Sequence, residues 1–125
     1  MNPDYKTMSD ADLRDILVDI RNTSEHLMDK LTPILEHPNS NQARAQKEQI
    51  VAEYALLKNR LKEIYHYIQL GRNDLSGFNF YNAFFCPKIR DCYLSCQAKT
   101  NETNLVKLHD SLWNIWDYAY LPLGN

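Results

Sequence analysis

The sequence contains few of the residues that favour tight turns, with three glycines and five prolines among 125 residues. A β-sandwich or β-barrel needs a turn signal about every eight to twelve residues, so an all-β fold is not expected. No segment approaches the roughly 20 consecutive apolar residues that span a bilayer. The net charge of -2 supplies no basic excess for binding nucleic acid or anionic lipid over the whole domain. Neither a membrane nor a nucleic acid is therefore the expected partner.

Cysteine is also scarce, and its three copies, Cys86, Cys92 and Cys96, lie close together in the sequence. An odd number of crowded cysteines is a poor disulfide framework for a secreted domain. Their Cys-x5-Cys-x3-Cys spacing also departs from the tight cysteine pairs of structural zinc sites. The first residues, MNPDYKTMSD, contain no basic start followed by an apolar run. We therefore expect a cytoplasmic protein whose reduced thiols pack in the core, with no metal and no cofactor.

Helical periodicity is the dominant pattern that is present, and we expect one domain over residues 1–125. Ser9 is placed to cap a first helix, and Asp12 three residues later completes a capping box. Pro33 should kink or end this helix near residues 29–32, because proline lacks a donor and clashes with the preceding turn. The apolar stripe of this helix has steps of three and four: Leu13, Ile16, Leu17, Ile20, Leu27, Leu31 and Ile34.

The second predicted helix has the most regular pattern. Ser40 can cap it, and Gly71 should stop it after Leu70. Ala52, Leu56, Tyr67 and Leu70 lie roughly opposite its apolar seam, so the helix is either central or meets a partner. The seam itself alternates steps of four and three: Ile50, Tyr54, Leu57, Leu61, Ile64 and Ile68.

Two further helices are predicted in the last third of the chain. An aromatic segment at residues 78–85 is expected to enter the core, and Pro87 then suits the first turn of a short third helix. A fourth helix is predicted over about residues 103–120. The expected fold class is all-α, a four-helix up-and-down bundle with a short, irregular third helix.

The segment RNTSEH, from Arg21 to His26, resembles the catalytic signature of HEPN-type ribonucleases, small helical proteins in which an arginine and a histidine act on an RNA phosphodiester. The resemblance covers six residues and implies Arg21 and His26 as the catalytic pair. A similar spacing recurs from Arg60 to His66. Arg21 and His26 lie about 140° apart around a helix, so such groups would converge only with a second protomer. The simpler interpretation is that both are solvated, and a HEPN-like ribonuclease is the alternative function.

Acidic and basic residues are distributed unevenly along the chain. Residues 1–39 contain eight acids and four bases, whereas residues 40–72 contain six bases and three acids. These charges can be solvated, can offset each other between helices, or can steer a protein partner toward the surface. An acidic helix face formed by Asp12, Asp15 and Asp19 would match a basic partner surface, for example that of a nuclease toxin.

The predicted helices carry more apolar surface than a bundle of this size can cover. Exposed patches that contain tryptophan or tyrosine are where binding energy concentrates. We therefore expect Leu56, Tyr67, Trp113 and Tyr120 to include the anchors of a self- or hetero-association. The sequence contains no phosphate-binding glycine loop and no Gly-x-Ser-x-Gly elbow. The predicted function is a non-enzymatic protein-binding module, such as an immunity- or antitoxin-type protein, an adaptor or a regulator, that occupies a partner surface.

Overall fold

The computed structural model describes residues 4–70 and 79–122, and every regular element within these ranges is helical. The α-helices are α1 (Asp10–Glu36), α2 (Asn41–Leu70), α3 (Cys86–Ser95) and α4 (Leu105–Tyr118). Short turns join or precede them: the 3-10 turns η1 (Tyr5–Thr7) and η3 (Lys99–Asn101), and the π-helical turn η2 (Tyr81–Phe85).

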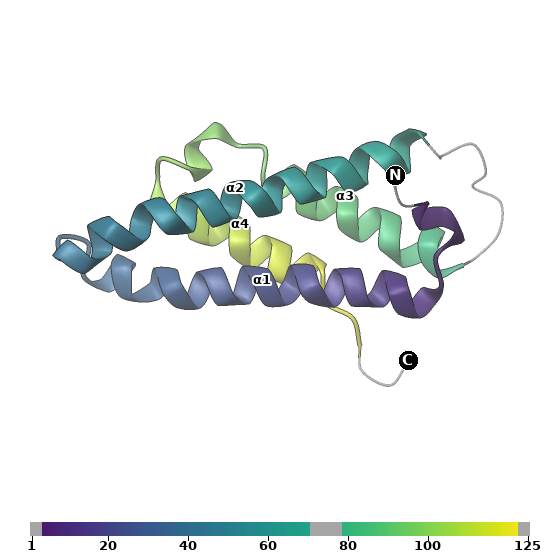
Figure 1. The fold of residues 1–125 in the computed structure, drawn as a ribbon, viewed down its shortest axis with the longest axis horizontal. Helices are drawn as coiled ribbons and strands as arrows, with labels where there is room; N and C mark the ends of the chain where they lie inside the picture. Colours follow the sequence, from purple (N-terminus) through teal and green to yellow (C-terminus); the bar gives the residue numbers. More distant parts are fainter. Residues whose placement is uncertain (1–3, 71–78, 123–125) are drawn as a thin grey trace.

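Successive helices run in opposite directions and form a closed ring of neighbours (Figure 1). α1 packs against α2 and α4, and α3 packs against the same two helices. The predicted four-helix up-and-down bundle is therefore confirmed. α2 and α4 occupy diagonal positions in this ring, so their outer faces point to opposite sides of the bundle.

α1 begins where the sequence predicts and continues beyond residues 29–32. The Ser9 Oγ accepts a hydrogen bond from the backbone N–H of Asp12 at 3.1 Å, which confirms the cap. Of the two predicted effects of Pro33, a kink or an end near residues 29–32, the end does not occur, because α1 continues through Pro33 to Glu36. Pro33 removes the one helical hydrogen bond that its N–H would have donated to the preceding turn, and the helix still continues for three more residues. The His37 N–H then bonds to the Pro33 carbonyl at 3.0 Å and closes the turn.

α2 is capped by Ser40, whose Oγ accepts from the Ala43 N–H at 3.1 Å. Gly71, the predicted stop signal, lies outside the described residues. The whole predicted seam of α2 is buried. Tyr54 is its bulkiest member and is fully covered, which requires a partner for its hydroxyl.

A π-helical turn leads directly into α3. The Cys86 N–H bonds to the Tyr81 carbonyl, five residues earlier, and Pro87 follows in the first turn of α3. This insertion accounts for the predicted irregularity of the third helix. Phe80 and Phe85 are buried as expected for this aromatic segment, but Phe84 is 44% exposed. Phe78 lies outside the described residues.

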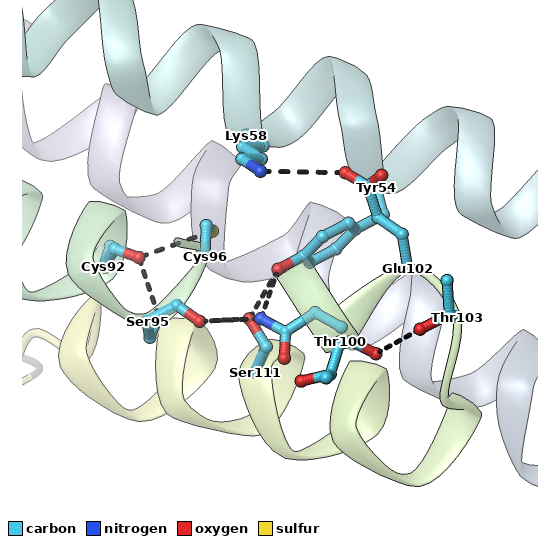
Figure 2. A network of polar contacts seen from close by, with 10 residues as sticks. Tyr54, Lys58, Cys92, Ser95, Cys96, Thr100, Glu102, Thr103 and Ser111 are labelled. Atoms are coloured by element: carbon cyan, nitrogen blue, oxygen red, sulfur yellow. Dashed lines mark hydrogen bonds and ion pairs between the residues drawn. The ribbon is translucent and has the colours of Figure 1, made fainter. Parts of the chain in front are cut away.

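A buried polar network closes the end of α3 against α2 and α4 (Figure 2). The Ser95 carbonyl accepts from the Ser111 Oγ at 2.8 Å and from the Asn101 Nδ2 at 3.1 Å. Asn101 also donates to the Tyr54 hydroxyl at 3.1 Å. Because the single hydroxyl hydrogen of Ser111 points to Ser95, Tyr54 is the donor in its 2.8 Å contact with Ser111. Within the described ranges no buried side-chain nitrogen or oxygen lacks a hydrogen-bond partner.

Candidate protein-binding surface

α4 has a sharply defined start and a buried inner face. Asn104 caps it, with Oδ1 accepting from the N–H groups of Val106 at 3.0 Å and Lys107 at 3.3 Å. Leu108, Leu112 and Ile115 are fully buried against the core. This orientation determines which side chains of α4 face outward.

The outer face of α4 carries alternating apolar and acidic side chains. At 100° per residue, Val106, Asp110, Trp113 and Asp117 lie within an arc of about 60° on α4, and Tyr120 follows just after the end of the helix. We call these five residues the α4 ridge, and all five are exposed. The exposed fraction is 58% for Val106, 49% for Trp113 and 48% for Tyr120. Tyr120 lies just beyond the helix, and its N–H bonds to the Asp117 carbonyl at 3.2 Å.

Arg21 of α1 extends toward the ridge and stacks on two aromatic rings. Its guanidinium carbon lies 4.0 Å from the centroid of the Trp116 ring and 4.7 Å from that of Tyr120. Both distances are within the range of cation–π attraction. The contact joins α1 to α4 at the surface. It holds the rings of Trp116 and Tyr120 near the C-terminal end of the ridge.

Trp113 is the centre of the ridge. Its ring neighbours that of Trp116, with 6.5 Å between centroids and an interplanar angle of 43°. Asp110 and Asp117 lie one turn before and one turn after it, on the same face. Both carboxylates are exposed, and neither forms an ion pair within the described part of the chain. The ring is therefore flanked by negative charge on the solvent side and by aromatic surface toward α1.

Lys88 of α3 holds the end of the ridge in place. Its Nζ donates to the Tyr120 carbonyl at 2.8 Å and to the Tyr118 carbonyl at 3.3 Å. Carbonyls at a helix C-terminus lack helical donors, and a cation there also complements the helix dipole. Lys88 thus stabilises the backbone that carries Tyr120.

The other two predicted anchors lie on α2. Leu56 is 70% exposed. Tyr67 is half-buried at an open hollow of about 1050 Å³, where its ring centroid lies 6.3 Å from that of Tyr5. Arg60 and His66, the second Arg–His spacing of the sequence, line the same hollow. Because α2 and α4 are diagonal, the four predicted anchors divide between two opposite surfaces.

The predicted acidic face of α1 is partly engaged within the chain. Asp12 and Asp15 are exposed, whereas Asp19 forms an ion pair with Arg60 of α2. A second pair, Lys30 with Glu53 at 3.4 Å, joins the same two helices. Some of the opposite charge of the two segments is therefore offset between α1 and α2.

Arg21 and His26, which the sequence analysis expected to be solvated alike, lie in different environments. His26 is exposed, but the expectation of a solvated Arg21 is wrong, because Arg21 is partly buried and its guanidinium stacks on the rings of Trp116 and Tyr120. The stripe periodicity placed Arg21 off the core of α1 and gave no information about what lay beside that flank.

Cys92 and Cys96 are fully buried. The Cys92 Sγ donates to the Ile115 carbonyl at 3.6 Å, and the Cys96 Sγ donates to the Cys92 carbonyl at 3.5 Å. Burial raises the pKa of both thiols above the ordinary value of 9.0, so both are protonated near neutral pH. Among the described residues, no three His, Cys, Asp or Glu side chains are placed to hold one metal ion.

The sequence interpretation missed Asp110 and Asp117 as members of the surface. Their signal is present in the spacing, since Val106, Trp113 and Tyr120 recur every seven residues and the two acids fall between them. Arg21 had no comparable signal, because its contact with Trp116 depends on how two distant helices pack.

Comparison with known proteins finds no matching family model, no similar curated protein and no similar solved structure. None of the helices in the described ranges has the length and apolar content needed to cross a membrane. The assignment of function therefore depends on the surface chemistry.

Proposed function

We propose that the protein is a non-enzymatic protein-binding module that occupies a partner surface through the α4 ridge. The observation that carries this proposal is the half-exposed Trp113 on the outer face of α4, between Val106 and the Tyr120 that follows the helix. Tryptophan and tyrosine are enriched among the few residues that supply most of the binding energy at protein interfaces, where surrounding contacts exclude water from them. Exposing such side chains in water brings no benefit to the fold itself.

Rigidity supports the same proposal. The Asn104 cap fixes the start of α4, and Lys88 fixes its end. Trp116 and Tyr120 are held by Arg21, so their rings lose little conformational freedom when a partner binds. Pre-organised contact residues reduce the entropic cost of association.

Within this function we retain three roles: an immunity- or antitoxin-type protein, an adaptor, or a small regulator, acting in the cytoplasm. All three act by covering a surface of another protein. Leu56 and the α2 hollow with Tyr67 form a second surface on the opposite side, available for self-association or for a further partner.

Site-specific photocrosslinking tests the proposal in the cells that make the protein. A photoreactive phenylalanine replaces Val106 on the ridge, which leaves Trp113 intact. The matched control replaces Leu94 of α3, whose exposed fraction of 51% is close to the 58% of Val106. We expect a discrete crosslinked species from position 106 that disappears when Trp113→Ala is added, and none from position 94. Equal crosslinking from both positions, or crosslinking that survives Trp113→Ala, contradicts the proposal.

A further inference from the structure

The α4 ridge also indicates what its partner presents. We propose that the partner inserts an arginine side chain over the exposed face of Trp113, with its guanidinium between Asp110 and Asp117. This inference rests on the proposed function, because it specifies the chemistry of the partner at the same surface. It commits to one occupant, a basic protein segment that contains arginine.

The protein's own Arg21 shows the arrangement that these rings accept. Its guanidinium carbon lies 4.0 Å from the Trp116 centroid. The same flank of α1 has a second example, in which Arg14 lies 4.5 Å from the centroid of the Phe80 ring. The neighbouring Trp113 is half exposed, and among the described residues no cation stacks on it.

Charge complementarity supports a cation at this position. Asp110 and Asp117 follow the same helix face as Trp113, at offsets of minus three and plus four residues, and side chains at these offsets are neighbours on a helix. A cation over the ring would therefore lie within reach of two carboxylates. Among the neighbouring cations, Lys107 lies to one side of this face, Arg21 is already stacked on Trp116, and Lys88 donates to the carbonyls of Tyr118 and Tyr120.

Arginine fits this arrangement better than lysine. Its planar guanidinium stacks on an aromatic face and can still donate hydrogen bonds from its edge to carboxylates. It is also less strongly hydrated than an ammonium group, so covering it with a ring costs less. An uncharged apolar anchor would cover Trp113 but would leave both carboxylates beside a surface without a donor.

The test uses the purified full chain and labelled peptides of repeated Arg-Gly-Ser, with citrulline or lysine in place of arginine as comparison probes. Citrulline keeps the shape of arginine and loses its charge. Fluorescence anisotropy at low salt should show binding of the arginine peptide that is weakened about tenfold by Trp113→Ala and by the double variant Asp110→Asn with Asp117→Asn. The citrulline peptide should bind at least about tenfold more weakly than the arginine peptide, and the lysine peptide should lie between them.

A matched control separates the ridge from overall charge. The double variant Asp29→Asn with Glu36→Gln removes an equal number of negative charges, two, from exposed positions of α1. Equal weakening in both double variants, or no preference for arginine over citrulline, overturns the inference. The crosslinking experiment tests the proposed function separately. If crosslinking from position 106 requires Trp113 but survives the loss of Asp110 and Asp117, the protein-binding function is supported and the arginine partner is rejected.

Discussion

The guanidinium carbon of Arg21 lies 4.0 Å from the centroid of the Trp116 ring, so a residue of α1 forms part of the surface of α4. α1 and α4 are the first and last helices of the chain. Their contact buries the inner faces of both helices and also brings together the cationic flank of one and the aromatic flank of the other. The candidate surface is therefore a product of the fold, since neither helix carries it alone.

Replacing Arg21 should test this contact directly. Arg21→Ala removes a cation stacked on two rings together with its packed methylenes, and we expect the free energy of unfolding to fall by about 1 kcal/mol. His26→Ala is the matched control on the same helix, where an exposed side chain contributes less than about 0.5 kcal/mol. Urea denaturation measures both values. Identical midpoints for the two variants would show that the stack contributes nothing to stability.

The buried network gives a second prediction. Tyr54→Phe removes the hydroxyl that bonds to Ser111 at 2.8 Å and to Asn101 at 3.1 Å. The variant should lose about 1 to 2 kcal/mol of folding free energy, because a buried amide hydrogen is left with fewer acceptors. A double-mutant cycle with Ser111→Ala isolates the pair. Strictly additive losses would mean that the two hydroxyl groups are not coupled.

The buried thiols predict the direction of the alkaline pH dependence. Burial raises the pKa of Cys92 and Cys96 in the folded protein, whereas the unfolded chain ionises near the ordinary value of 9.0. Above about pH 9 the unfolded state has therefore released protons that the folded state retains. The free energy of unfolding should then fall with rising pH, by up to about 1.4 kcal/mol per pH unit for each thiol.

Denaturant unfolding under reducing conditions at several pH values from about 8 upward measures this slope. Cys92→Ala should make the slope shallower, since one of the two protons is no longer involved. A variant whose stability falls as steeply as that of the natural chain would show that Cys92 does not hold its proton on folding.

Much of the fold could be predicted because its signals are local. The stripe from Leu13 to Ile34, the Ser9 and Ser40 caps and the Pro87 start each depend on residues within a few turns. Pro33 misled the prediction of where α1 ends, because the rule for proline considers the local backbone alone, whereas the helix continues to Glu36 with Ile34 buried in the core.

The candidate surface could be predicted only in part. Trp113 and Tyr120 stood out as large aromatic residues beside an apolar stripe. Placing them together with Arg21, and apart from Leu56 and Tyr67, required knowing that α4 packs beside α1 and diagonally to α2. The pairing of helices depends on contacts between residues far apart in the sequence, and the periodicity of a single helix does not contain that information.

Lys88 provides the last prediction, because it connects stability to the ridge. Its Nζ bonds to the carbonyls of Tyr120 and Tyr118 at 2.8 and 3.3 Å. Lys88→Met keeps most of the apolar stem and removes the charge, so the final turn of α4 should fray while the core stays intact. We expect a loss of about 0.5 to 1 kcal/mol in folding free energy and faster amide hydrogen exchange confined to residues 118–121.

Crosslinking from position 106 should weaken less than it does in Trp113→Ala, because only the Tyr120 end of the ridge loosens. Unchanged exchange at residues 118–121 would show that the Lys88 contacts do not hold this end, and exchange that rises throughout α4 would assign Lys88 to the stability of the whole helix.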